Sequence, residues 1–395
     1  MKKAFKQILK FFGYLLCYMA YPFSFLIPRN GKKIAFGCYR GAFCDNSKYL
    51  FIELAEKGHD AVWLSTKRST VRQVRAMGLP AEWVFSPHGA WRALRSKYWV
   101  VSSYTSDIFW AFSGGAKVLN LWHGVGVKRI EYNSLSGPLY DRYIRKTFKE
   151  AFFHPESYRK PERLVVGSHE LTPMFSSAFR IPEAHCIECG YPRNGMLRAD
   201  SRRREDFIMR YEPASTMELC GKLKSYSKVW LYMPTWRESQ REIFSQGMNL
   251  DAIQSILKER NELLLLKPHS NTVVKSLDTY SNIMLLDGKM DVYPLLPLTD
   301  VLITDYSSIL YDYILMEEKS VVLYLYDKQE YLDAHSSYFP FDENTIGQTA
   351  GNFTEFLDIM RSGPQSLDEE RRAALIKKFW GKKAFDYKDI LDWLP

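Results

Sequence analysis

The stretch LWHGVGVKRI, residues 121–130, places a histidine at the end of an apolar run, and two glycines and a Lys-Arg pair follow it. An imidazole titrates near neutral pH, so His123 has the chemistry of a general acid or base. A lone histidine beside an apolar strand is more often a structural residue. The glycines and the cations Lys128 and Arg129 next to His123 favour a functional interpretation instead.

Polar side chains gather in the same way at the ends of three other predicted strands. They are Thr235, Arg237, His269, Asp305, Ser307 and Ser308. These groups suit phosphate, because a guanidinium forks onto phosphate oxygens and the helix expected to start near Ile309 presents its N-terminal amides. Helix capping stays open for the hydroxyls, and an N-cap or a buried partner role stays open for Asp305.

Other kinds of site find less support in the motifs. The chain has no G-x-x-x-x-G-K-S/T and no G-x-G-x-x-G, which disfavours a P-loop NTPase and a typical dinucleotide enzyme. The six cysteines predict reduced thiols rather than a disulfide framework in a chain of this length. Cys186-x-x-Cys189 lacks the second pair that a structural zinc site needs, so we predict no metal site.

The elements that would position these residues alternate between apolar, β-rich runs and helical spacing. We predict strands at 32–37, 61–66, 98–103, 117–123, 163–168, 228–235, 262–269, 283–287, 301–306 and 320–326. This order predicts an α/β protein of two doubly wound, Rossmann-like domains, with ligands beyond the carboxyl ends of the strands. The expected segments are 1–30 (basic, apolar and membrane-associating), 31–200 (acceptor domain), 201–227 (linker or helix), 228–352 (donor domain) and 353–395 (C-terminal helices).

The net charge of +9 is concentrated at the N-terminus. Residues 1–33 hold seven cations and no acid, which leaves 47 cations against 45 anions in the other 362 residues. This localisation favours a membrane surface and not nucleic acid as the partner. The uncharged run 11–28 between these cations has three readings: an interfacial anchor, a membrane span, or an ordinary packed helix. We expect the anchor.

Taken together, these motifs resemble the CDP-glycerol glycerophosphotransferase family of teichoic-acid primases and polymerases. The resemblance covers roughly residues 33–345. It is carried by FGCYRGAFCDNSKYLF (36–51), LWHGVGVKRI (121–130), GYPRN (190–194), YMPTWRES (232–239), KPHS (267–270) and DVLITDYSSILYDY (300–313). The chain departs from the family pattern where WHGTPLK has become WHGVGVK and where Ser47 follows the Asp-Asn pair, which leaves the acceptor undefined.

The resemblance implies a GT-B type fold with a cleft between its domains. It implies transfer of glycerol phosphate or ribitol phosphate from a CDP-alditol to a hydroxyl of a lipid-linked or polysaccharide acceptor, with CMP leaving. It also implies a peripheral enzyme on the cytoplasmic face of the membrane, in teichoic-acid, capsule or surface-polysaccharide synthesis, without a required metal or cofactor. The alditol and the number of units added stay open. A GT-B glycosyltransferase using a UDP- or GDP-sugar and a non-catalytic nucleotide or lipid-carrier binder are the alternatives.

The resemblance also distributes roles among the residues. His123 would be the general base, and His269 would donate to the diphosphate as CMP leaves. Thr235, Arg237, Asp305, Ser307 and Ser308 would hold the donor, together with Asp312, for which ribose binding and a buried structural pair are both open. Asp45, Asn46 and Lys128 would lie on the acceptor side.

Overall fold

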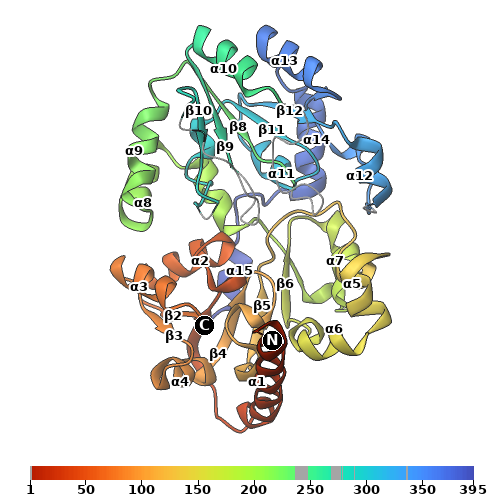
Figure 1. The fold of residues 1–395 in the computed structure, drawn as a ribbon. Coiled ribbons are helices and arrows are strands. Elements are labelled where there is room, and N and C mark those ends of the chain that lie inside the picture. The colour runs from red at the N-terminus through yellow and green to blue at the C-terminus, as the bar shows by residue number, and fades with distance from the viewer. Residues whose placement is uncertain (1, 236–247, 268–276, 278, 289, 335–336) are drawn as a thin grey trace. The chain divides into compact units, whose positions relative to one another are not determined.

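The computed structural model describes residues 2–235, 248–267, 277, 279–288, 290–334 and 337–395 (Figure 1). The chain divides into two compact units. Unit 1 comprises Met1–His123, Arg129–Arg193 and Gly381–Pro395, and unit 2 comprises Gly124–Lys128 and Asn194–Trp380. Each unit contains a parallel sheet flanked by helices, so the predicted α/β class is confirmed.

Unit 1 is built on a seven-stranded parallel sheet with the order β3-β2-β1-β4-β5-β6-β7. The strands are β1 (Asn30–Phe36), β2 (Asp60–Ser65), β3 (Ala81–Trp83), β4 (Ser96–Val101), β5 (Lys117–Asn120), β6 (Arg163–Val166) and β7 (Cys186–Glu188). The helices are α1 (Lys2–Ser24), α2 (Asp45–Glu56), α3 (Arg68–Ala76), α4 (Pro87–Arg95), α5 (Gly137–Tyr140), α6 (Phe148–Phe153), α7 (Thr172–Phe179) and α15 (Lys388–Trp393). The strand order reverses between β1 and β4, where an open parallel sheet places its ligand crevice.

Unit 2 also contains a parallel sheet, with six strands in the order β10-β9-β8-β11-β12-β13. Its strands are β8 (Lys228–Tyr232), β9 (Glu262–Leu266), β10 (Ile283–Leu285), β11 (Val301–Thr304), β12 (Ser320–Tyr324) and β13 (Gln348–Ala350). Its helices are α8 (Ser201–Tyr211), α9 (Ala214–Leu223), α10 (Leu250–Glu259), α11 (Ile309–Tyr313), α12 (Lys328–Ala334), α13 (Phe353–Ser362) and α14 (Glu369–Trp380). α10 and α13 cover one face of this sheet, where Ile253 and Phe356 pack on Trp230 and Tyr324.

All ten predicted strands are present, because strands buried on both faces read as apolar runs such as the fully buried ELLLL of β9. Some of the helices begin at side-chain caps: Asn352 accepts from Glu355 N at the start of α13, and Asp200 accepts from Arg203 N at α8. The units differ from the predicted segments at several places, because Gly124–Lys128 and residues 194–200 of the predicted 31–200 segment belong to unit 2. Residues 201–227 form α8 and α9 within unit 2, and the C-terminal helices divide between the units at Trp380.

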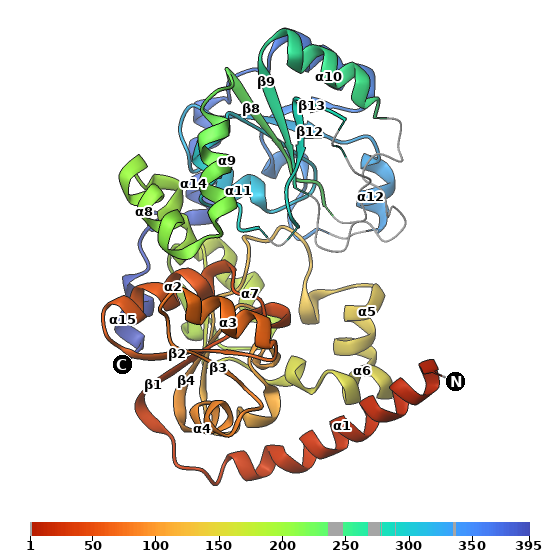
Figure 2. The same ribbon diagram turned by 60° about the vertical axis from the view of Figure 1, so that its left-hand side comes forward.

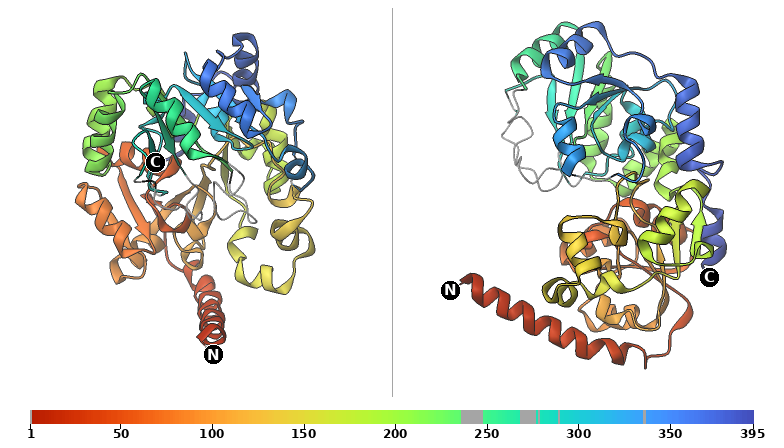
Figure 3. Two further views of the ribbon diagram at one scale, coloured as in Figure 1. Left: turned by 45° about the horizontal axis from the view of Figure 1, so that its top comes forward. Right: turned by 90° about the vertical axis from the view of Figure 1, so that its right-hand side faces the viewer.

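Helix α1 runs along the outside of unit 1 toward α6 (Figures 2 and 3). Its tyrosines face inward: the Tyr18 ring packs 5.1 Å from Trp110, and the Tyr18 hydroxyl donates to Phe152 O. The opposite face exposes Phe5, Ile8, Leu9, Phe12, Leu16, Met19 and Phe23. Within the described residues, no helix combines the length and apolar character needed to cross a membrane.

Arg29, just beyond α1, is a structural residue rather than part of a basic surface. Its guanidinium donates to the main-chain oxygens of Ala93, Ser96, Phe112 and Gly114. Burial lowers the pKa of Arg29 to about 10. These bonds fix the connection between α1 and β1 to unit 1, so this one of the seven N-terminal cations is engaged within the protein.

Candidate active site

His123 follows β5 at the carboxyl edge of the unit 1 sheet, as predicted. Asn120 shapes the turn, because its side-chain oxygen accepts from Trp122 N and its amide donates to Ser103 O. Trp122 then adopts the left-handed conformation, with φ of 54°. The imidazole lies beside the Trp122 ring, and its Nδ1 is 3.1 Å from the main-chain oxygen of Ser102.

This contact defines the tautomer of His123. A carbonyl oxygen only accepts, so Nδ1 carries the proton in the neutral ring and Nε2 presents its lone pair. The ring reaches solvent on one side, while densely packed protein atoms desolvate it on the others. Burial lowers the pKa of His123 below its ordinary value, Asp45 and the Ser102 carbonyl raise it, and Arg193 lowers it further. The net effect keeps His123 neutral at neutral pH, the form that a base needs.

The loop after β4 holds the Ser102 carbonyl in place. The Asp107 carboxylate accepts from the main-chain nitrogens of Ser102 and Ser103, at 2.9 and 2.8 Å. Burial raises the pKa of Asp107 to about 7, against the lowering effect of those bonds. Ser47 bonds through its hydroxyl to the Ser102 hydroxyl at 2.8 Å. The loop that orients the imidazole is thus tied to both Asp107 and α2.

The GYPRN motif contributes Arg193, which was not among the predicted site residues. Arg193 Nη1 bonds to Asp45 Oδ1 and to the main-chain oxygen of His123. Gly190 is required here, because a Cβ atom would lie 2.2 Å from the main-chain oxygen of Ala384 in the returning C-terminal segment. Asn46 is fully buried and donates to Trp122 O, so it supports the turn before His123 from inside the protein.

Residues 124–128, directly after His123, belong to unit 2. A Cβ atom at Gly124 would lie 2.7 Å from Ser308 Oγ, so the glycine permits this close approach. Tyr338 N donates to Val127 O, and Lys128 Nζ donates to the hydroxyl of Tyr331 at 2.7 Å. The Tyr331 ring stacks on Tyr306 at 3.8 Å. Lys128 therefore helps to fasten this segment within unit 2.

In unit 2 the predicted donor residues follow β8 and β11, the two strands at the point where the strand order reverses. The Asp305 carboxylate accepts from Thr235 N, Thr235 Oγ1 and Tyr306 N and is buried. Asp305 and Thr235 thus brace the two loops against each other, which for Asp305 is the buried-partner role that the sequence left open.

Ser307 and Ser308 remain half-exposed at the start of α11, and the Ser308 side chain makes no capping bond. α11 spans only Ile309–Tyr313, so hydroxyls and local amides, rather than a helix dipole, are the donors offered to an anion. Asp312 is buried and accepts from the Tyr293 hydroxyl at 2.8 Å, which favours the structural one of its two readings. Arg237 and His269 lie outside the described residues.

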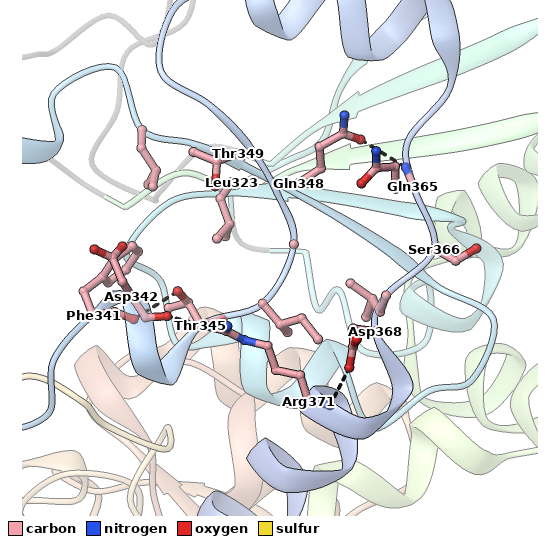
Figure 4. Close-up of a pocket in the computed structure, with 14 residues that line it drawn as sticks. Leu323, Phe341, Asp342, Thr345, Gln348, Thr349, Gln365, Ser366, Asp368 and Arg371 are labelled. Atoms are coloured by element: carbon pink, nitrogen blue, oxygen red, sulfur yellow. Dashed lines mark hydrogen bonds between the residues drawn. The ribbon is translucent and has the colours of Figure 1, made fainter.

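The cysteines do not form a site in the part of the chain that the structure describes. All six are free thiols, as predicted, and no group of three His, Cys, Asp or Glu side chains has the arrangement to hold a metal ion there. A cavity of about 340 Å³ in unit 2 contains none of the predicted residues. Its polar groups bond to one another: Arg371 to Thr345 O and Gln365 N to Gln348 (Figure 4). The cavity therefore adds no residue to the candidate site.

Comparison with known proteins gives a consistent result. A sequence model of the family described as "CDP-Glycerol:Poly(glycerophosphate) glycerophosphotransferase" matches residues 19–389. The chain is 25% identical to a teichoic acid glycerol-phosphate transferase of Staphylococcus aureus over 89% of both chains. It is 26% identical to a teichoic acid poly(glycerol phosphate) polymerase of Bacillus spizizenii over 90% of this chain and 89% of that one.

Among solved structures, the wall teichoic acid polymerase TagF has the same fold, with a TM-score of 0.74 at 22% identity, over 100% of this chain and 97% of that one. The family match covers nearly the whole chain and includes every motif described above. It decides against the glycosyltransferase alternative as the class of enzyme. The chain therefore belongs to the CDP-Glycerol:Poly(glycerophosphate) glycerophosphotransferase family and is a transferase of this class.

Proposed function

We propose that this enzyme transfers glycerol phosphate or ribitol phosphate from a CDP-alditol to a hydroxyl of a membrane-linked or polymeric acceptor in teichoic-acid or related surface-polymer synthesis. The acceptor oxygen attacks the β-phosphorus of the donor, the bond from that phosphorus to the bridging oxygen breaks, and CMP leaves. His123 takes the proton of the attacking hydroxyl. Acyl or glycosyl chemistry plays no part in this step.

The observation that carries the proposal is the state of His123. Its Nδ1–H is engaged by the Ser102 carbonyl, its Nε2 lone pair is left for a substrate, and burial lowers its pKa. A positioned base of this kind contributes roughly 10²–10⁴ in rate. Charge stabilisation supplies most of the rest in phosphoryl transfer.

On the donor side, Ser307 and Ser308 are the residues we assign to the phosphates. Both are half-exposed, and neither is consumed as a helix cap. From the family resemblance we assign the guanidinium of Arg237 and the imidazole of His269 to the diphosphate as well. We propose that these cations replace a metal ion, so activity should survive EDTA. Loss of activity in EDTA that magnesium restores would contradict this part.

We propose that α1 lies in the membrane interface at the cytoplasmic face, which brings the enzyme to a lipid-linked acceptor. One face of the helix packs on unit 1 through Tyr14 and Tyr18. The other exposes large apolar side chains, with Phe12 57% and Leu16 62% exposed, and Lys6 and Lys10 are exposed beside them. An amphipathic helix with lysines suits anionic lipid headgroups.

CMP release by the purified full chain is the test. CDP-glycerol, CDP-ribitol and UDP-glucose would be supplied in parallel, each with membranes of the source cell as acceptor. Release from one CDP-alditol alone supports the proposal and identifies the donor. Turnover of UDP-glucose without CMP release from either CDP-alditol would overturn it.

A further inference from the structure

Arg193 connects two parts of unit 1, α2 and the segment that carries the proposed general base His123. Its Nη1 lies 2.5 Å from Asp45 Oδ1 and 3.0 Å from the main-chain oxygen of His123, and its side chain is 5% exposed. The guanidinium therefore bonds at once to a carboxylate on α2 and to the residue that carries the imidazole. A lysine could not reproduce this, because only a planar guanidinium presents several donors in fixed directions.

The backbone around these bonds adopts costly conformations. Asp45 has a φ of 61° and Trp122 a φ of 54°, in the left-handed region that non-glycine residues rarely occupy. Such residues persist where the surroundings hold them, commonly at functional sites. Here Arg193 holds Asp45, and Asn46 Nδ2 holds the Trp122 carbonyl at 3.0 Å. The backbone just before the base is thus fixed by side chains from α2 and the GYPRN motif.

We propose that Arg193 and Asp45 form a positioning pair for the base: Arg193 fixes the His123 carbonyl, and Asp45 stabilises the imidazolium that forms when the ring takes the acceptor proton. The inference rests on the proposed function for its catalytic meaning, but the pair acts on the imidazole whether or not a substrate is present. Among the residues that the structure describes, Asp45 on α2 and Arg193 in the GYPRN motif are the charged groups that shift the pKa of His123, and the Ser102 carbonyl accepts from Nδ1. Their opposite charges should move its protonation in opposite directions.

Direct titration of the imidazole tests the pair. The full chain would be isotope-labelled at histidine, the His123 signal assigned by its loss in His123→Asn, and its titration midpoint measured by NMR. We expect Arg193→Gln to raise the midpoint and Asp45→Asn to lower it, each by about half a pH unit. The double variant should return it toward wild type. Midpoints that stay unchanged or move in the same direction would overturn the inference, since a purely structural role predicts no opposition of sign.

Arg193→Lys separates geometry from charge. This variant should leave the titration midpoint of His123 near that of the wild type. It should lower kcat for CMP release about tenfold, the rate effect expected from the loss of roughly one hydrogen bond, and KM for the donor should change little. A wild-type kcat in Arg193→Lys would refute the positioning role. If the wild-type enzyme released no CMP from any CDP-alditol, the proposed function would fail, yet the titration would still decide whether the pair controls the imidazole.

Discussion

Replacement of Gly124 by alanine should damage the donor site without unfolding the protein. The new Cβ atom would lie 2.7 Å from Ser308 Oγ and 3.4 Å from Ser308 Cβ. Only the first distance is prohibitive, and the hydroxyl can relieve it by rotating to another staggered position. We therefore expect the free energy of unfolding to change by less than about 1 kcal/mol, and the Ser308 hydroxyl to lose its place.

The loss of activity follows from that displacement. A hydrogen bond to a charged group contributes about 1.5–3 kcal/mol. Because about 1.4 kcal/mol corresponds to a tenfold rate change, kcat/KM for the CDP-alditol should fall roughly 10- to 150-fold. The assay is CMP release under substrate-limited conditions, beside urea unfolding of the same protein.

The same loop provides the control. Nothing lies within 4 Å of a Cβ atom at Gly126, so Gly126→Ala should stay within about twofold of wild type. Ser308→Ala should lose as much activity as Gly124→Ala, and the double variant should lose no more than Ser308→Ala alone, because both act through one hydroxyl. Equal activity of Gly124→Ala and Gly126→Ala, or additive losses in the double variant, would refute the reasoning.

Three further outcomes are expected. His123→Ala should lower kcat by roughly 10²–10⁴ in a folded protein, and near-normal CMP release would remove it from the base role. Burial raises the pKa of Asp107 to about 7, so the folded chain keeps a proton that the unfolded chain releases near pH 4, and stability falls as pH rises through that window. Asp107→Asn should remove up to about 1.4 kcal/mol per pH unit of this slope in urea unfolding; an unchanged slope would contradict it. Phe12→Ser with Leu16→Ser should weaken binding to anionic vesicles more than tenfold in a sedimentation assay, and unchanged binding would exclude α1 as the contact.

The sequence predicts the central strands well and the sheet edges poorly. β8, β9 and β11 are buried on both faces and read as apolar runs. The three-residue edge strands β3, β7 and β13 carry too little signal, whereas the edge strand β10 is predicted because it lies in the apolar run IMLL. Chain order also conceals that the last segment returns to unit 1 after Trp380, since that depends on contacts such as Gly190 against Ala384.

In the candidate site, residues marked by the neighbouring sequence were predicted, and residues defined by distant contacts were not. His123, Ser307 and Ser308 are recognisable because each follows an apolar strand, and strand ends meet at one edge of a parallel sheet. Arg193 cannot be recognised as a site residue from the sequence, because its partner Asp45 lies 148 residues away and no periodic pattern links the two. The inward role of Asn46 was missed for a related reason: the residue type is that of a ligand contact, and only burial reveals that it bonds to the protein itself. For Asp305 the buried role was one of the open alternatives, and the structure selects it.

The path of the chain also affects how His123 is held in place. The chain passes between the units after His123, Lys128, Arg193 and Trp380, and the first and third of these crossings are joined by the bond from Arg193 to the His123 carbonyl. The bond therefore joins two points of unit 1 that lie 70 residues apart in the chain. The His123 carbonyl is held from outside its own loop, so the base reaches its final position only when both segments of unit 1 have folded together.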